Sequence, residues 1–442
     1  MTSAQVLLSA ILLGGLLLQA VVPGRRLVIV SSAAALACLV ATLWGVSDTA
    51  KILADVPWDV LVILVALGVV SEVLAQARAF DWLAVKVSDL SRGDARRLYL
   101  VLAVTMYVTS GLVNNLTALL LVLPMVLVLL RLMAPDRRYV RWTLGLLLVA
   151  CNLGGAATPI GDFPAILMLS GGRLTFGRYL QFALPATAIA IVVLLGVVRF
   201  AVRPAEAVPR DPVTLRLTRA IVTALHRGLV VERSLAAPAL GSLGLMLAAW
   251  SLLPARLGVS PALVCWLGGG ITLLMARRRG ETIARAATQG EALLFLLSLF
   301  VMVGAVRSAG LFESVARALL AIPASPQVQL TLFLVLAGLL TGVFSAGPGM
   351  AALLDVADVL AKRLPPHAVY VGLALAVCAG SSLFLTAATS GPLAQALTEA
   401  ADLRDAQGKK LRFGFREFVP VGLVSFAVIE GVALVYAWIF AR

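Results

Sequence analysis

Long apolar runs, almost free of charged residues, constrain this chain more than any other feature. They recur along its whole length and measure about 20 residues, which is what a helix needs to cross the hydrocarbon core of a membrane. The composition agrees, because 61% of the 442 residues are apolar and 13% are charged, against about 45–50% and about 25% in soluble domains. The sequence therefore predicts an all-α polytopic membrane protein. It excludes a soluble enzyme, a nucleic-acid-binding module and a disordered protein.

Four of the apolar runs are interrupted by polar residues. The runs at 98–133 and 327–361 are too long for one span and are broken near the middle, which predicts a re-entrant helical hairpin in each. The runs at 142–170 and 367–398 contain Gly, Pro, Ser and Thr, which predicts broken transmembrane helices. We expect a first half over 1–200, a basic cytoplasmic connector over 201–235, and a second half over 236–442.

The distribution of basic residues supports this topology. It places about three quarters of the 36 Lys and Arg residues on one side, which is then the cytoplasmic side. The two halves run in opposite directions and share features in the same order, such as Ser110-Gly111-Leu112-Val113 and Thr341-Gly342-Val343-Phe344. We therefore expect two inverted repeats, an organisation typical of secondary transporters.

The first-half breaks carry most of the candidate binding residues. At the hairpin tip, two adjacent amides would coordinate a cation or hold a polar substrate, or they would only cap the hairpin helices. In the broken helix, Asp162 is either a coupling carboxylate or the N-cap of the helix that follows, since an ionisable group within a span is costly. A sodium site at Asn115 and Asp162 is one expectation. The candidates are Asn114, Asn115, Thr117, Asn152, Thr158, Gly161 and Asp162.

The second-half breaks offer hydroxyls and bare backbone but no carboxylate or amide. Such groups suit an ion or an oxyanion and cannot titrate a proton near neutral pH. The candidate residues there are Ser345, Gly347, Ser381, Ser382, Thr386 and Thr389.

The remaining polar residues receive plainer interpretations. Glu430 lies inside the last apolar run, where it would pack against an Arg or Tyr or act in a proton relay. Glu72, Asp355 and Asp358 are expected near the ends of their runs, and His226 and His367 in loops. The four cysteines are expected to be small buried apolar residues. No metal cluster or cofactor motif is present, so Na⁺ or H⁺ as a coupling ion is the only cofactor expected.

Two stretches resemble the ion transporter superfamily with a citrate-transporter-like domain, which includes arsenite permeases, sodium/proton antiporters, the P protein and dicarboxylate symporters. They are Asn114-Asn115-Leu116-Thr117-Ala118 and the run from Asn152 to Asp162 with Gly154-Gly155, Thr158 and Gly161. The resemblance implies a homodimer in which a transport domain moves like an elevator against a scaffold. It departs at the first tip, where antiporters and arsenite permeases carry an Asp and this chain has two amides.

These features predict a secondary active transporter in the inner membrane, and not an enzyme. It would move a small ion through the lipid bilayer, driven by a sodium or proton gradient. The missing tip carboxylate favours an anion or oxyanion, dicarboxylate-like or arsenite-like, over the alternative of sodium/proton antiport. An ion channel is a further alternative, which saturable, gradient-coupled flux would exclude. No nucleic-acid partner is expected.

Overall fold

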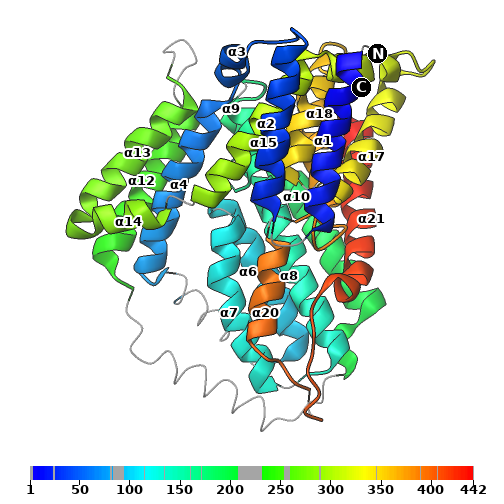
Figure 1. The fold of residues 1–442 in the computed structure, drawn as a ribbon. Helices are drawn as coiled ribbons and strands as arrows, with labels where there is room; N and C mark the ends of the chain where they lie inside the picture. The colour runs from blue at the N-terminus through cyan, green and yellow to red at the C-terminus, as the bar shows by residue number, and fades with distance from the viewer. Residues whose placement is uncertain are drawn as a thin grey trace.

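Apart from an isolated bridge between Arg404 and Lys410, every regular element in the described part of the chain is helical (Figure 1). This computed structural model therefore confirms the predicted all-α class. The described residues are 3–22, 25–79, 82, 94–113, 115–133, 135–159, 161–170, 172–207, 231–252, 259–287, 290–344, 346–388, 390–405 and 407–441.

In the described residues, the first half contains three long apolar helices before the first predicted hairpin and one after the first predicted broken helix. Its helices are α1 (Ser3–Val21), α2 (Arg26–Leu43), α3 (Thr49–Ala54), α4 (Trp58–Gln76), α6 (Ala95–Leu112), α7 (Asn115–Met133), α8 (Arg137–Ala157), α9 (Phe163–Ser170) and α10 (Phe176–Val197), which continues into a π-helical turn, η1 (Val198–Val202), and a 3₁₀ turn, η2 (Pro204–Ala207).

The second half follows a similar order. Its helices are α12 (Arg233–Leu252), α13 (Pro261–Met275), the 3₁₀ turn η4 (Arg277–Arg279), α14 (Gly280–Ala287), α15 (Gly290–Ser308), α16 (Leu311–Leu320), α17 (Pro326–Phe344), α18 (Ala346–Leu360), α19 (Pro366–Ser381), α20 (Gly391–Ala400) and α21 (Phe415–Phe440).

Many of these helices are suited to a membrane. Within the described residues, five helical segments are long and apolar enough to cross one, or six if α15 and α16, bent by 63°, form one span. Shorter apolar helices of 10–17 residues accompany them, among them Ser3–Gln19, Leu27–Leu43 and Pro261–Met275. These helices are shorter than the about 20 residues that a crossing usually needs.

The two predicted hairpin regions are each a pair of packed helices. In the first, α6 packs on α7 and the chain turns through Val113, which is extended (φ −136°, ψ 167°). In the second, α17 packs on α18. Figure 1 shows α6 and α7 in the lower part of the molecule and α17 and α18 in the upper part. The tip residues Asn114 and Ser345 lie outside the described residues.

Helices α8 and α19 form the centre of the molecule. Every residue of α8 from Trp142 to Ala157 is buried, and so is every residue of α19 from Ala368 to Ser381. A helix that is apolar on all sides is stable only when other helices surround it. The pair packs together, with α6 and α10 against α8 and with α17 and α21 against α19. The breaks at the ends of α8 and α19 are thereby placed deep inside the protein.

Helices of one half also pack on helices of the other half. Helix α2 lies against α15, and α13 lies against α4. The helices α9 and α20 also contact the opposite half: α9 contacts α18 of the second hairpin region, and α20 contacts α7 of the first. In Figure 1, α9 accordingly lies above the centre and α20 below it.

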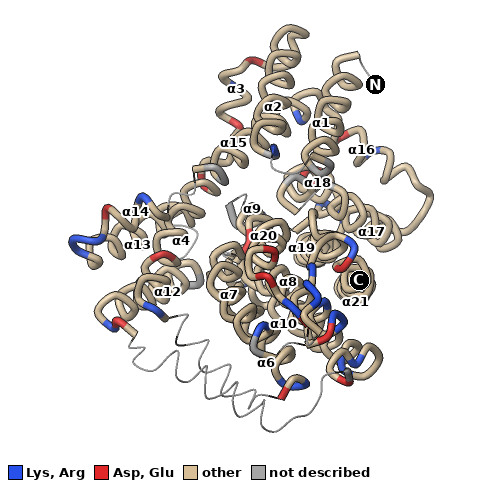
Figure 2. Tube along the Cα trace, turned by 60° about the horizontal axis from the view of Figure 1, so that its bottom comes forward, with Lys and Arg blue, Asp and Glu red and all other residues tan. Residues whose placement is uncertain are grey.

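Basic residues gather where several helices begin or end (Figure 2). Arg138 at the start of α8 donates to the Val202 carbonyl beyond α10 (2.5 Å), and Arg137 pairs with Glu417 at the start of α21 (2.7 Å). The Tyr139 hydroxyl donates to the Ala95 carbonyl at the start of α6 (2.8 Å). These contacts bring together at one end segments that the charge distribution assigns to one side of the membrane.

Some expectations need correction. His367 is not in a loop but is the second residue of α19, stacked on Phe182. Helix α8 begins at Arg137 rather than at the first apolar residues of its run, because Asp136 caps it by accepting from the Tyr139 N–H (3.0 Å). The short helices α3, α14 and α16 were not expected. Most of the connector, at 208–230, and His226 lie outside the described residues.

Candidate functional site

The starts of α7 and α9 meet at the end of α8. The Asn115 N–H, at the start of α7, donates to the Gly161 carbonyl (3.2 Å). Asp162 precedes α9, and its Oδ1 accepts from the Phe163 N–H (2.9 Å). Both side chains flank Gly155, where a Cβ would lie 2.8 Å from Asn115 Nδ2 and 2.8 Å from Asp162 Cβ. A glycine at this position therefore allows the amide and the carboxylate to approach each other.

Hydrogen bonds hold Asn115 in place. The Ser110 hydroxyl lies within hydrogen-bonding distance of Asn115 Oδ1 and of the Cys151 carbonyl, the latter at 2.7 Å. The Cys151 thiol in turn donates to the Asn115 carbonyl (3.3 Å). With Oδ1 facing a hydroxyl, the Nδ2 hydrogens of Asn115 are directed to Asp162 or to a ligand.

Two of the predicted residues hold backbone segments together. The Thr158 hydroxyl donates to the Gly111 carbonyl (2.6 Å), which ties the broken helix to α6. A Cβ at Gly161 would lie 2.6 Å from the Ser110 carbonyl oxygen, so only glycine fits there. The contacts of Thr158 and Gly161 therefore join α6 to the segment between α8 and α9.

Asn152 connects the breaks of the two halves. Its Nδ2 donates to the Ser381 carbonyl (3.2 Å) and to the Ser382 hydroxyl (3.1 Å) at the end of α19. All three residues are buried. These bonds bring a first-half amide and second-half hydroxyls, 229 residues and more apart in the chain, to one place.

A small cavity lies at this junction. Its volume is about 10 Å³, close to the space that one water molecule needs. Residues of both halves line it, including Asn152, Asp162, Tyr179, Ala346, Cys378 and Ser381. The described part of the centre is therefore tightly packed in this conformation, with a few polar groups among mostly apolar lining residues.

The other predicted residues lie around this junction or outside the described part. Gly347, near the start of α18, faces the Phe163 ring, from which a Cβ would be 3.2 Å away. Thr117 on α7 and Thr386 after α19 are partly buried. Thr389, like Asn114 and Ser345, is outside the described residues.

The sequence reading missed several residues at the centre. Ser110 and Cys151 bond Asn115, and Tyr179 lines the cavity. The sequence indicated Cys151 only as a small buried apolar residue. Ser390, just before α20, is fully buried, and its hydroxyl has no partner among the described residues.

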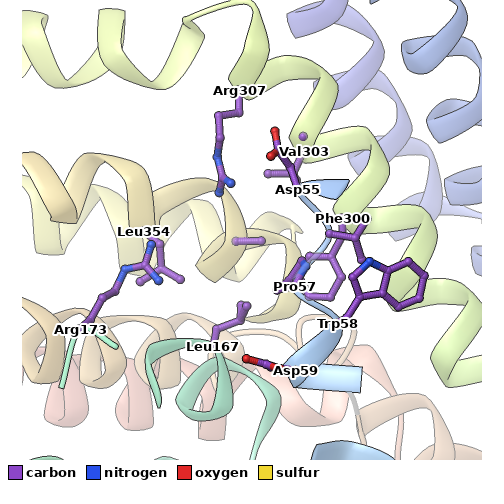
Figure 3. Close-up of a pocket in the computed structure, with 13 residues that line it drawn as sticks. Asp55, Pro57, Trp58, Asp59, Leu167, Arg173, Phe300, Val303, Arg307 and Leu354 are labelled. Atoms are coloured by element: carbon purple, nitrogen blue, oxygen red, sulfur yellow. The ribbon is translucent and has the colours of Figure 1, made fainter. Parts of the chain in front are cut away.

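A larger pocket of about 350 Å³ opens near the upper end of the molecule (Figure 3). Arg173, in the loop after α9, and Arg307 on α15 direct their guanidinium groups into it. Each pairs with an aspartate of α18. Arg173 bonds both oxygens of Asp358 (2.7 Å each), and Arg307 bonds Asp355 (2.7 Å).

The pocket and the centre are close neighbours. Phe300 of α15 lines the pocket, and its ring packs on Phe163, the residue that follows Asp162, with 5.6 Å between the ring centroids. The exposed carboxylates of Asp55 and Asp59, at the start of α4, also line the pocket. A solute in the pocket would therefore be separated from Asp162 by this aromatic pair.

Comparison with known proteins places the chain in a family. The family model described as CitMHS, citrate transporter, matches residues 16–345 and 245–442. The chain is similar to the magnetosome protein MamN of Paramagnetospirillum magneticum (28% identity, covering 93% of this chain and 94% of that protein). It is also similar to an uncharacterized transporter of Mycobacterium tuberculosis (27% identity; 87% and 86%).

Two further matches are more distant. The pig P protein is 29% identical over 174 residues, which is 39% of this chain and 20% of the P protein. The fold matches that of the YdaH transporter of Alcanivorax borkumensis over 99% of this chain and 98% of that one, with a TM-score of 0.53 and 16% identity. The resemblance predicted from the stretches around Asn115 and Asp162 is thus confirmed. The chain belongs to the CitMHS citrate transporter family of the ion transporter superfamily, and it is a multi-pass membrane transporter.

Proposed function

We propose that this chain is a secondary active transporter that carries a small carboxylate or oxyanion across the inner membrane, driven by a proton or sodium gradient. The observation that carries the proposal is the junction at which the two breaks meet. There, Asn152 of one half bonds Ser381 and Ser382 of the other. A substrate bound between the breaks would contact both halves, which alternating access requires.

The N-terminal ends of α7, α9 and α18 favour an anion. Helix α7 starts at Asn115 and α9 at Phe163, beside each other, and α18 starts at Ala346, which lines the same small cavity as Asp162. The N-terminal end of a helix carries a partial positive charge and attracts anions. Because the Asn115 and Phe163 N–H groups already donate to the Gly161 carbonyl and to Asp162, an anion would bind the N–H groups that follow them or displace these contacts. The Asn115 and Asn152 amides add neutral donors, and Asp162 is the single carboxylate lining the cavity.

The packing of the halves supports an inverted repeat that moves as two bodies. Helices α2 on α15 and α13 on α4 would form the scaffold, and the hairpin regions with α8, α9, α19 and α20 would form the moving part. The close contacts also correspond. A Cβ at Gly154 would collide with the Tyr107 carbonyl of α6, and one at Gly380 would collide with the Gly338 carbonyl of α17. The homodimer implied by the resemblance belongs to this proposal.

Sodium/proton antiport is the second candidate. It is favoured by the position of Asp162 beside the Asn115 amide, where a carboxylate and an amide oxygen would bind a sodium ion or exchange it for a proton. The two candidates differ in what moves a proton. An antiporter responds to sodium alone, whereas the proposed transporter responds to its anion.

The experiment is to record internal pH in proteoliposomes while sodium, citrate, a dicarboxylate and arsenite are added outside in turn. For a proton-driven transporter, we expect a proton movement with one of the anions or with arsenite and none with sodium alone. For a sodium-driven one, we expect uptake of the labelled anion only when sodium is present outside. A response to sodium alone would overturn the anion proposal in favour of antiport.

Asp162→Asn tests the site directly. Asn still accepts from the Phe163 N–H, so the α9 start is preserved, and we expect loss of the response to the driving gradient in a folded protein. Asp136→Asn is the matched control, because Asp136 also caps a helix, α8, but lies at its outer end. If both variants keep wild-type coupling, Asp162 only caps α9.

A further inference from the structure

Glu430 is a buried carboxylate on α21 with no partner. Its side chain belongs to a residue that is only 5% exposed, and neither Oε1 nor Oε2 forms a hydrogen bond with any described residue. The sequence offered an Arg or a Tyr as packing partner, and none is present among the described residues. An ionised carboxylate in such surroundings costs several kcal/mol or more, so its charge must be removed or compensated.

The surroundings of Glu430 are apolar or already bonded. Helix α17 presents Gly338, at which a Cβ would lie 2.7 Å from Oε2 and 3.3 Å from the Ala376 carbonyl of α19. The same Cβ at Gly338 would lie 3.2 Å from the ring of Phe426, which is also on α21. Glu430 therefore faces a backbone surface left open by a glycine, together with one carbonyl oxygen.

Among the described residues, the other titratable groups on the helices packed against α21 either form hydrogen bonds or ion pairs with other residues, or carry no positive charge that would balance an ionised Glu430. Helix α17 has none. The Tyr436 hydroxyl of α21 donates to the His367 carbonyl, and the Cys378 thiol of α19 and the His367 imidazole make no ion pair with Glu430. The others pair with oxygens away from Glu430: Tyr370 with Asp358, Tyr179 with Ala156, Tyr139 with Ala95, Arg137 with Glu417 and Arg138 with Val202. Arg141, Arg178 and Arg416 make no ion pair with it in the described residues.

The first half has a bonded pair at the corresponding place. Gly338 lies 231 residues after Tyr107, the same spacing that relates Thr341 to Ser110. The Tyr107 hydroxyl bonds the Thr187 hydroxyl of α10 (2.9 Å). In the second half, Gly338 stands in place of the tyrosine. Glu430 of α21 faces the space that a tyrosine side chain at that position would fill.

Glu430 is also in contact with the central junction through one residue. The Gly338 carbonyl abuts Gly380, which directly precedes Ser381 and Ser382. Those two serines accept the bonds of Asn152. A shift of α17 relative to α19 would therefore change the surroundings of Glu430 and the junction together.

We infer that Glu430 is a proton-binding site of the transport cycle, neutral in the conformation described and ionised when α17 moves away and admits water. The proton comes from water, forms an O–H bond on the carboxylate, and returns to water when the site opens. A proton fits better than a sodium ion, because a metal cation needs several oxygen ligands, whereas neither carboxylate oxygen has a polar partner in the described residues.

The role in coupling rests on the proposed function, but protonation can be tested without a substrate. Infrared difference spectra of the purified protein in proteoliposomes are recorded between neutral and alkaline pH. We expect the C=O stretching band of a protonated carboxyl group at neutral pH, absent in Glu430→Gln. Glu72→Gln should retain it, since Glu72 is a membrane glutamate bonded by Gln76 (3.0 Å). An unchanged band in Glu430→Gln would overturn the inference, and Asp162→Asn removes any contribution of that second carboxyl.

A transport measurement uses labelled citrate as the probe. Glu430→Gln should lose proton-driven accumulation at least tenfold and keep citrate exchange at equal pH on both sides, since the neutral amide mimics the protonated acid. Accumulation at the wild-type level would overturn the coupling role. If no variant moves citrate, the proposed function fails for that substrate, while the infrared result still decides whether Glu430 holds a proton. Glu430→Asp, which keeps the acid, should retain the band if Glu430→Gln does not fold.

Discussion

The breaks of the two halves meet at one junction but are bonded very differently. In the first half, the Ser110 and Thr158 hydroxyls, the Cys151 thiol and the Asn115 amide all have partners. In the second half, the buried hydroxyls of Thr341 and Ser390 have none among the described residues. A buried polar group without a hydrogen bond costs about 1–3 kcal/mol.

This difference suggests different roles for the two breaks: the first holds its polar side chains in place, and the second contains polar groups that lack partners. The bonded first half fixes Asn115 and Asp162 in a single arrangement. Unpartnered groups in a natural protein usually mark a place where a ligand, a water or a second conformation supplies the missing bond. The first half also has buried hydroxyls without a partner in the described residues, at Thr109 and Thr143, so the contrast concerns the residues that bond at the junction. Among the second-half groups without a partner, Glu430 is the most polar. Breaking matched positions in the two halves tests this view.

The largest effect is expected where backbones touch. In Gly154→Ala and Gly380→Ala, the added methyl group collides with the Tyr107 and Gly338 carbonyls respectively. Each should cost about 3 kcal/mol or more, because the obstacle is backbone that cannot turn aside. We expect a large loss of folded protein or of melting temperature, measured by fluorescence-detected size-exclusion chromatography after heating.

Gly431→Ala is the control for this pair, since a Cβ there meets nothing within 4 Å. It should be neutral or stabilise α21 by about 0.5–1 kcal/mol. Equal losses in Gly154→Ala and Gly380→Ala would show that both halves are equally tight at this contact. A wild-type melting temperature for Gly380→Ala would mean that the second contact yields easily, contrary to the structure.

A smaller effect is expected from the hydroxyls. Ser110→Ala removes a group that bonds buried oxygen atoms and should cost about 1–3 kcal/mol. Thr341→Val removes a hydroxyl that has no partner and keeps the shape, so the free energy of unfolding should be unchanged or increased. Melting temperatures of the two variants measure the difference. A loss for Thr341→Val as large as for Ser110→Ala would show that the second-half hydroxyl is bonded, and the contrast between the halves would disappear.

Sequence alone predicted the breaks because the residues that cause them are local. Pro159 and the polar residues around Asp162 interrupt an apolar helix, whatever the rest of the chain does. Gly154-Gly155 do not, because α8 continues through them to Ala157. The start of α8 was predicted too late for the opposite reason. Its first turn is basic, so hydropathy hides it, and the Asp136 cap was the signal that would have found it.

Contacts across the chain could not be predicted in this way. Ser110 and Cys151 are 41 residues apart, and Asn152 and Ser382 are 230 apart. Nothing in a local pattern fixes which of the many hydroxyls and amides will meet. The sequence therefore indicated Asn152 and Ser382 only as separate residues and did not indicate Ser110, whose bond to the Cys151 carbonyl depends on how α6 packs on α8.

The smallest effect is expected from the ion pairs around the upper pocket, and it sharpens the distinction between parts that move and parts that do not. Arg307–Asp355 joins α15 to α18, and the two side chains are 45% and 20% exposed. A double-mutant cycle with Arg307→Gln and Asp355→Asn should give a coupling energy of about 0.2–1 kcal/mol, because solvent screens exposed pairs.

Arg173–Asp358 is the matched pair, since Asp358 lies on the same helix. It is bidentate, and Asp358 also accepts from the Tyr370 hydroxyl (2.8 Å), so its coupling energy should be larger. If α15 belongs to the scaffold and α18 to the moving part, breaking Arg307–Asp355 should change the transport rate more than the stability. Breaking Arg173–Asp358, which lies within the moving part, should do the reverse. The same balance of rate and stability for both pairs would contradict that division of the molecule.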